Sequence, residues 1–331
     1  MPSERTLVSF IIPAKNEEHL LPETLDSIIN IIDSRIEYEI IVVDNGSSDN
    51  TMTIAQDKNA RVITQHTGTI GSLRNTGASQ AHGNSLVFLD ADVSITQEWL
   101  APFLDTIESF KNNPYIITGS RCSTSESAGW ISSSWFQQPP VIRHTTHVGT
   151  GHMITTKILF NSISGFDESL KTAEDFDFCT RAIKSGASVI GNHQLKVFHK
   201  GTPETLSEFF LREVWHGSGD VTTLKTTWNS KVALTSIVFL LAHILALLGI
   251  IFLPQSLSLL YISAITILVI CSLSAWKKYY FAPIGIIIKN MLLYYIYYWG
   301  RSMSVINRIV PFLGHHVPRS GRSRAQKRQP Y

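Results

Sequence analysis

Short apolar runs alternate with amphipathic segments over the first part of the chain. Apolar residues recur at helical spacing in residues 16–32, and helices are also predicted near 51–58 and 71–82. Strands that alternate with helices predict an α/β domain in which helices cover both faces of a mainly parallel sheet. Four runs have the length and β-branched content of buried strands: LVSFIIPA (7–14), EIIVVD (39–44), ARVITQ (60–65) and SLVFLD (85–90).

The hydropathy of the chain changes near residue 231. His243 is the only strongly polar residue between 232 and 253, and 257–275 is a second run without charge. Each run is long enough to cross a hydrocarbon core as a helix. Lysines precede the first run and follow the second, so we expect a hairpin with its lysine-bearing ends in the cytoplasm, in a multi-pass protein of the cytoplasmic membrane.

The segments that flank this hairpin are amphipathic. Residues 284–306 contain Lys289 and Asn290 among many tyrosines, so this segment is expected to lie in the membrane interface or to span it. Residues 206–231 are predicted to form an amphipathic interfacial connector, although a helix packed under the soluble domain would show the same pattern. The basic tail at 307–331 favours attraction to anionic membrane lipids, and a solvated tail fits equally well.

These boundaries predict a soluble domain at 1–205 that is followed by the connector, the membrane region and the tail. The beginning of the chain, MPSERTLVSF, has no apolar secretory segment, and the three cysteines match no disulfide or metal spacing. We therefore expect the soluble domain to lie on the cytoplasmic side. No nucleic-acid partner is expected.

Polar side chains stand at the ends of the predicted strands. The sequence PAKNEE follows the first strand, DNGSSDNT the second and DAD the fourth, and ligands of such sheets bind beyond the carboxyl ends of strands. On a strand, Asp90 and Asp92 would point to the same face, where like charges repel unless a cation or a proton intervenes. Mg²⁺ or Mn²⁺ suits such a pair, although a D-x-D sequence alone is more often a turn or a solvated rim.

In this order, the motifs resemble those of the glycosyltransferase family 2 enzymes, which have the nucleotide-sugar-binding fold called GT-A. The resemblance runs from Leu7 to about Gly201. It places Pro13, Ala14 and Glu17 of FIIPAKNEE at positions that meet the nucleotide base. In IIVVDNGSSDNT, Asp44 matches the aspartate that hydrogen-bonds the base.

Two residues that follow Asp44 have a structural alternative. Ser48 is expected to cap the next helix, and Asp49 fits a cap and a ligand-binding role equally well.

The later motifs supply the remaining roles. In GSLRNTGASQAHGNSLVFLDADV the resemblance assigns Arg74 to the diphosphate, Asp92 to the metal, and Asp90 to the ribose or the metal. For Arg74 a surface ion pair is the alternative.

The run from Gly151 through GFDE leads to the acidic pair Glu174 and Asp175, of which Asp175 matches the catalytic base. A helix N-terminus would also favour acids at those positions. His199 of LKVFHKG is expected on a strand, where the resemblance implies that it completes the metal or diphosphate site; a structural histidine is the alternative.

The resemblance implies transfer of one sugar, with inversion, from a nucleotide-diphosphate sugar such as a UDP- or GDP-sugar. A nearby membrane anchor suggests a membrane-associated acceptor hydroxyl or a polyprenyl phosphate, for synthesis of a cell-envelope glycan or a glycolipid. Processive synthases of the family carry Q-x-x-R-W, which is absent around Phe209, Arg212 and Trp215, so single transfer is favoured. A processive synthase subunit and a non-catalytic nucleotide-sugar-binding membrane protein remain alternatives.

The segment between the donor motifs and Gly151 matches no family pattern. It carries Trp130, Trp135 and Phe136, for which burial is favoured over stacking on a sugar or contact with lipid. Acceptor choice is expected to reside there.

Overall fold

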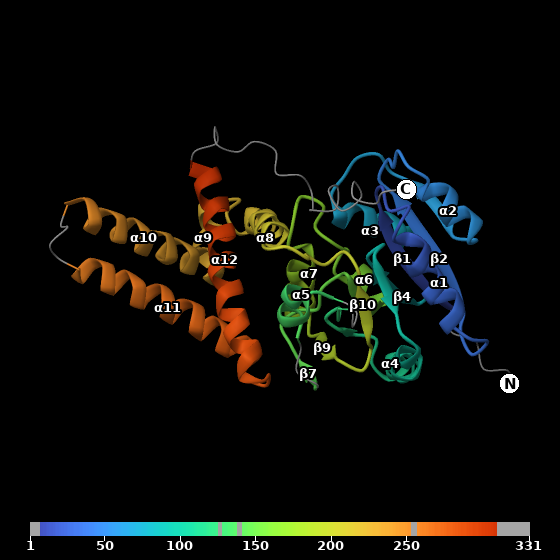
Figure 1. Ribbon diagram of the computed structural model, residues 1–331. Coiled ribbons are helices and arrows are strands. Elements are labelled where there is room, and N and C mark those ends of the chain that lie inside the picture. Colours follow the sequence, from blue (N-terminus) through green and yellow to red (C-terminus); the bar gives the residue numbers. More distant parts are fainter. Residues whose placement is uncertain (1–6, 125–127, 138–140, 253–256, 310–331) are drawn as a thin grey trace. The chain divides into compact units, whose positions relative to one another are not determined.

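The computed structural model describes residues 7–124, 128–137, 141–252 and 257–309 (Figure 1). The chain divides into two compact units. The first consists of residues 1–125 and 138–200, and the second of residues 126–137 and 201–331. The short segment 126–137 therefore belongs with the C-terminal helices although it interrupts the first unit in sequence, a division that the sequence did not predict.

The first unit is built on one eight-stranded sheet with the order β3-β2-β1-β4-β8-β6-β9-β7. Strands β1 to β4 are mutually parallel, as the alternation of strands and helices predicts, whereas β8 runs antiparallel between β4 and β6. The α/β fold is thus confirmed, and its second half is mixed. The strands are β1 (Leu7–Ala14), β2 (Glu37–Asp44), β3 (Arg61–Thr64), β4 (Ser85–Leu89), β6 (Ile116–Gly119), β7 (Ile142–His144), β8 (His152–Thr156) and β9 (Ser188–Asn192). A separate two-stranded sheet pairs β5 (Val93–Ile95) with β10 (Val197–His199).

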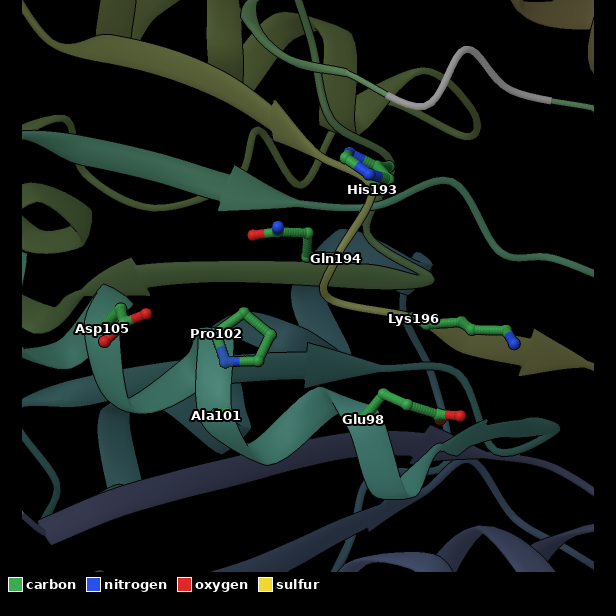
Figure 2. A pocket seen from close by; sticks show the side chains of 7 residues that line it. All are labelled: Glu98, Ala101, Pro102, Asp105, His193, Gln194 and Lys196. Atoms are coloured by element: carbon green, nitrogen blue, oxygen red, sulfur yellow. The ribbon is translucent and has the colours of Figure 1, made fainter.

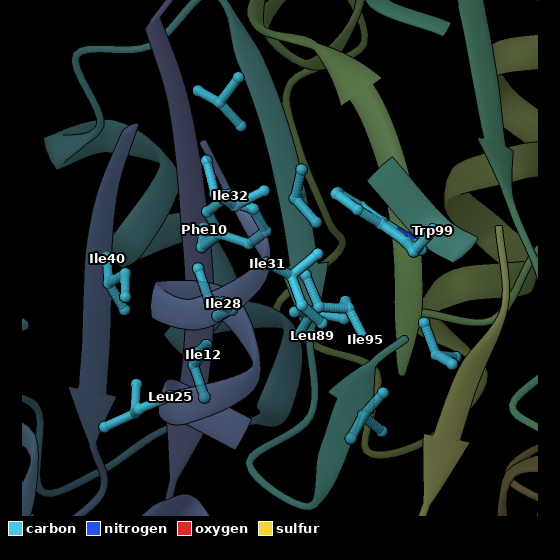
Figure 3. Packing of buried hydrophobic residues seen from close by; sticks show 14 of the residues in the cluster. Phe10, Ile12, Leu25, Ile28, Ile31, Ile32, Ile40, Leu89, Ile95 and Trp99 are labelled. Carbon is cyan, nitrogen blue, oxygen red and sulfur yellow. The ribbon is translucent and has the colours of Figure 1, made fainter. Parts of the chain in front are cut away.

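Helices bury both faces of this sheet. On one face, Phe10 and Ile12 of β1 pack with Leu25 and Ile28 and with Trp99, as Figure 3 shows. The residue between them, Ile11, belongs to the core on the other face, which is the pattern of a strand buried on both sides. The helices of this unit are α1 (Leu21–Ile31), α2 (Thr51–Asp57), α3 (Ile70–Gln80), α4 (Leu100–Asn112), α6 (Lys157–Ser162) and α7 (Glu174–Lys184), and a 3₁₀ turn covers Gln97–Trp99.

Helix α3 approaches the sheet closely because of a glycine. A Cβ atom at Gly77 would lie 2.5 Å from Cγ2 of Ile11 and 3.1 Å from Cγ2 of Val43. Only a residue without a side chain permits this approach. The close approach of α3 to the sheet holds Arg74, one turn earlier in this helix, near the carboxyl ends of the parallel strands.

The second unit consists of helices. They are α5 (Trp130–Trp135), α8 (Leu206–Asp220), α9 (Leu224–Asn229), α10 (Lys231–Phe252), α11 (Ser258–Tyr279) and α12 (Ile284–Ile309). Among the described residues, α10 and α11 are the two helices long and apolar enough to cross a membrane. Both predicted spans are therefore helices, and most of their large apolar side chains are exposed, as membrane association requires.

Helix α12 lies across the lysine-bearing halves of α10 and α11 (Figure 1). It contacts α10 through Phe239, whose ring lies 5.6 Å from that of Tyr298, and α11 through the hydrogen bond of 2.7 Å between Ser274 and Tyr298. Helix α8 packs along α12 with Phe209 fully buried, and its position in the membrane interface stays a prediction. The predicted basic tail beyond residue 309 lies outside the described residues.

The close contact at Gly77 predicts the effect of a single methyl group. Alanine is the better helix former by about 1 kcal/mol, yet Gly77→Ala should lower the free energy of unfolding by about 1–3 kcal/mol, because the methyl group overpacks Ile11. Thermal unfolding of the full chain in detergent measures this. Ser79→Ala, at an exposed position of the same helix, is the matched control. A Gly77→Ala variant as stable as Ser79→Ala would contradict the packing argument.

Candidate active site

Three potential metal ligands meet beyond the end of β4. Strand β4 ends at Leu89, and the chain turns through Asp90 and Asp92 into β5, so the two aspartates do not share a strand face as predicted. The turn brings them together instead. His199, at the end of β10, joins them because its strand pairs with β5. Ligand atoms of Asp90, Asp92 and His199 all lie within 4.8 Å of one another, and Nε2 of His199 is 3.3 Å from Oδ1 of Asp92.

This group of ligands fits a divalent cation. Atoms that all lie within 4.8 Å of one another can bind a common ion. Carboxylate oxygens suit both Mg²⁺ and Mn²⁺, and the imidazole nitrogen of His199 offers a third ligand atom. Asp92 is 1% exposed and Asp90 is half-buried, so the group has one buried and one open side. The chain thus has an acidic site of the kind that holds a metal ion.

A buried arginine links this site to the acidic pair of α7. Nη2 of Arg74 lies 2.7 Å from Oδ1 of Asp90, and its Nη1 lies 2.7 Å from Oε1 of Glu174. The Arg74 side chain is only 2% exposed, so it faces the two acids rather than solvent. Thr150 adds a hydrogen bond of 3.1 Å to the same oxygen of Glu174. Arg74 therefore places a positive charge between Asp90 and Glu174, a pairing that the sequence did not reveal.

The two acids at the start of α7 have different surroundings. Glu174 is buried against Arg74, whereas Asp175 is partly exposed. Burial, together with the carboxylate of Glu174, raises the pKa of Asp175 from the ordinary 3.8 to about 6. The backbone N–H of Phe176 donates to Oδ1 of Asp175 at 2.7 Å. The pKa of Asp175 thus lies well above that of an ordinary aspartate. Both acids also stand in the first turn of α7, as the alternative interpretation expected.

The residues predicted to meet a nucleotide lie at the adjoining ends of β1 and β2. Pro13 and Ala14 pair in register with the last residues of β2, of which Asp44 is the final one. Asp44 is fully buried, and its carboxylate accepts hydrogen bonds from the N–H and the hydroxyl of Ser47. Glu17 is also buried, and its N–H donates to Thr51 at 2.7 Å. These four residues are brought together, and Asp44 also closes a turn.

The expected cap of helix α2 is wrong for Ser48. Its N–H donates to Oδ1 of Asn16 at 2.8 Å, so Ser48 binds the loop after β1. Asp49 accepts the hydrogen bond from the N–H of Thr51 at 3.0 Å and a second from the N–H of Glu18 at 3.2 Å. Asp49 therefore fastens the start of α2 to the neighbouring loop.

Asn75 fixes the loop that carries the GFDE run. Its Nδ2 donates to the carbonyl of Phe166 and to Oε1 of Glu168, both at 2.9 Å, and its Oδ1 accepts from the N–H of Phe166. This loop leads into α7, so Asn75 helps to place the acidic pair. The only signal in the sequence was its position beside Arg74.

His152 is a second residue whose role the sequence did not indicate. Its side chain is completely buried, and burial lowers its pKa to about 3, so the imidazole stays neutral. Nε1 of Trp99 donates to Nε2 of His152 at 2.9 Å, and the hydroxyl of Ser120 lies 3.1 Å from Nδ1. The preceding residue, Gly151, accepts a backbone hydrogen bond from Asp90. His152 thus fixes the strand end against which Asp90 rests.

A shallow groove of about 450 Å³ lies elsewhere on the first unit, between the start of α4 and the segment that joins β9 to β10 (Figure 2). None of the acidic-site residues lines it. Its charged groups are of both signs and no aromatic side chain besides His193 lines it, so it does not present a sugar-stacking surface. The lining residues are Glu98, Ala101, Pro102, Asp105, His193, Gln194 and Lys196.

Known proteins resemble the chain over most of its length. Residues 9–163 match the family described as Glycosyl transferase family 2. The chain is 26% identical over 232 residues to Glycosyltransferase AglE of Haloferax volcanii, which covers 67% of this chain and 75% of the relative. A second relative is the dolichyl N-acetyl-alpha-D-glucosaminyl phosphate 3-beta-D-2,3-diacetamido-2,3-dideoxy-beta-D-glucuronosyltransferase of Methanococcus voltae. The two chains are 24% identical over 234 residues, which are 64% of this chain and 72% of the relative.

The fold also resembles that of a solved enzyme. The mannosyltransferase PcManGT from Pyrobaculum calidifontis, solved in complex with GDP-Man and Mn²⁺, superposes with a TM-score of 0.59 at 17% identity. The alignment covers 93% of this chain and 88% of that one.

The raised pKa of Asp175 predicts that this residue destabilises the folded chain at neutral pH. Folding favours the protonated form of Asp175. The contribution of this residue to the stability of the folded chain is therefore complete below pH 3.8 and is lost as the pH rises through about 6. Asp175→Asn should therefore raise the unfolding temperature by a few degrees at neutral pH, and the gain should vanish below pH 3.8. Asp177→Asn, in the same turn and paired with Arg181, should give no gain. If Asp175→Asn raised the unfolding temperature equally at neutral pH and below pH 3.8, the raised pKa of Asp175 would be contradicted.

Proposed function

Because this chain is a glycosyltransferase with a family 2 domain, we propose that it transfers a single sugar, with inversion, from a UDP- or GDP-sugar to a lipid-linked acceptor hydroxyl. The observation that supports the proposal most directly is the Arg74 bridge. It joins Asp90 at the metal-binding group to Glu174, the neighbour of Asp175. A cation site and a titratable carboxyl group are thereby held in one network.

In this proposal the donor binds across the ends of β1, β2 and β4. Pro13, Ala14, Glu17 and Asp44 would meet the nucleotide, and the metal would be held by Asp92, His199 and Asp90. When bound, Mg²⁺ or Mn²⁺ stabilises the negative charge that develops on the departing nucleoside diphosphate. Arg74 acts through the acids that it holds.

Asp175 is the proposed base. A sugar hydroxyl is a poor nucleophile near neutral pH and must lose its proton during attack, whereas a lipid phosphate is already ionised and needs no base. A carboxyl group with a pKa of about 6 is mostly ionised at neutral pH and still accepts a proton readily. This favours a hydroxyl acceptor. One displacement on the face opposite the leaving group then inverts the anomeric carbon.

The acceptor is proposed to be lipid-linked because the chain is membrane-associated. The named substrate of the Methanococcus voltae relative is a dolichyl-linked sugar phosphate. Lys231 begins α10 and Lys277 and Lys278 end α11, so the positive-inside tendency would place the first unit on the cytoplasmic side of a multi-pass protein.

Metal binding tests the donor site directly. Asp92→Asn should weaken Mn²⁺ binding, measured calorimetrically in the presence of UDP, about 10- to 100-fold, because one carboxylate ligand is lost. Asp105→Asn, which removes an exposed acid of the same unit, is the control. Undiminished Mn²⁺ affinity in Asp92→Asn, or transfer that is indifferent to chelators, would remove the metal from the proposal.

The base is tested by transfer itself. Membranes are incubated with a panel of nucleotide sugars, with and without lipid extract, and the released nucleotide is measured. The rate should fall as the pH drops through about 6, because Asp175 becomes protonated. Asp175→Asn should lower kcat about 10²- to 10⁴-fold and leave nucleotide affinity intact, whereas Asp177→Asn should retain activity. Normal turnover by Asp175→Asn would remove this residue from the role.

A further inference from the structure

An exposed pair of aromatic rings lies beside Asp175. Phe176 follows Asp175 in the first turn of α7 and is 53% exposed. The ring of His147, which is also exposed, lies 5.9 Å from that of Phe176 at an interplanar angle of 65°. An edge-to-face pair leaves ring surface uncovered, whereas two stacked rings would cover each other. His147 and Phe176 are called the aromatic corner.

The packing of α7 does not use Phe176. This helix buries Phe178, Cys179 and Ala182 in the core on one face of the sheet, and Phe176 lies outside that stripe. A single exposed apolar side chain is common on protein surfaces. Two exposed rings beside a carboxyl group whose pKa is raised to about 6 are instead typical of a ligand site.

The loop before β8 runs along the first turn of α7 in the opposite direction. At the beginning of this loop, His147 contacts Phe176. Two residues later, a Cβ atom at Gly149 would lie 3.6 Å from Oδ2 of Asp175, so the bare backbone of the loop lies against this carboxyl group. The aromatic corner and Asp175 therefore face the same stretch of loop.

The loop then continues to the metal-binding group. The hydroxyl of Thr150 donates to Oε1 of Glu174 at 3.1 Å. A Cβ atom at Gly151 would lie 3.1 Å from Oδ2 of Asp90. The aromatic corner and the metal-binding group thus contact opposite ends of the loop, and Asp175 lies between them in the order of contacts.

This order matches the requirements of the proposed reaction. In an inverting displacement the acceptor hydroxyl attacks from the face opposite the leaving group, and the leaving diphosphate belongs with the metal. The base takes the proton of that hydroxyl, so the acceptor sugar lies against Asp175 on the side away from the metal. A pyranose presents C–H groups on one face, and these are attracted to the negative face of an aromatic ring.

We propose that the aromatic corner binds the acceptor sugar, a pyranose whose C–H face stacks on Phe176 with His147 at its edge. Bound there, the sugar would hold one hydroxyl against the carboxylate of Asp175. The identity of this sugar as the acceptor rests on the proposed function, whereas the stacking of a pyranose on these rings does not. His147 also belongs to the segment before Gly151 in which acceptor choice is expected to reside.

Binding of free sugars tests the aromatic corner without transfer. The full chain, in a detergent without sugar, is mixed with the methyl glycosides of glucose, galactose, mannose and N-acetylglucosamine, and saturation-transfer NMR measures their contacts. At least one glycoside should give a signal concentrated on the ring protons of one face. Phe176→Leu should raise its Kd about 3- to 10-fold, and Phe176→Tyr should not, because tyrosine keeps the aromatic face.

A matched control separates the aromatic corner from other exposed apolar groups. Ile183→Ala removes an exposed apolar side chain from the same helix and should leave the Kd unchanged. His147→Ala should raise the Kd, because one of the two rings is lost. The proposal is overturned if none of the four glycosides binds, or if Phe176→Leu and His147→Ala bind them like the unmodified chain.

Transfer to lipid extract distinguishes the acceptor from the donor. Phe176→Leu should raise the KM for the extract about 3- to 10-fold and leave the KM for the nucleotide sugar unchanged, because the ring touches only the acceptor. A rise confined to the KM for the nucleotide sugar would assign the aromatic corner to the donor and overturn the proposal.

The two proposals fail separately. Glycoside binding that depends on Phe176, in a chain that transfers no sugar, would reject only the proposed function. Transfer with a KM for the acceptor that is indifferent to Phe176 and His147 would reject only the acceptor role of the aromatic corner.

Discussion

The geometry of the first unit depends on how two acids are kept together at the end of a strand. Asp90 and Asp92 repel each other, and Glu174 and Asp175 would add to the repulsion if nothing intervened. Arg74 lies among them almost without solvent contact and pairs with one acid from each motif. Loss of a buried partner of this kind costs about 3–5 kcal/mol, since the remaining carboxylates are left uncompensated. The same pairing therefore stabilises the fold and positions the groups proposed for metal binding and for proton transfer.

Local patterns in the sequence predicted much of this arrangement. The strands that end at Ala14, Asp44 and Leu89 are short apolar runs followed by polar residues, and the parallel order requires that their ends meet. The strand that carries His199 was also expected. Each of these strands could be predicted because the residues that define it are adjacent in the chain.

The contacts between distant motifs could not be predicted. The ion pair of Arg74 and Glu174 joins residues that are 100 positions apart in the chain, and nothing near Arg74 distinguishes this pair from a surface ion pair. The turn at Asp90 could not be predicted either. The sequence does not show whether the strand ends before or after this aspartate, and the two aspartates share a strand face only if the strand continues through both. The hydrogen bond from Nδ2 of Asn290 to the carbonyl of Ser134 likewise joins residues that are 156 positions apart.

The path of the chain through the segment 126–137 has a consequence for dissecting the protein. The polypeptide leaves the first unit, contributes α5 to the second, returns, and leaves again after Lys200. A fragment that stops at residue 200 keeps Trp135 but lacks Phe209, Tyr279 and Tyr294, whose rings surround it. Such a fragment presents an uncovered aromatic surface to water and will self-associate. A soluble catalytic fragment requires replacement of this excursion by a short polar linker as well as removal of the C-terminal helices.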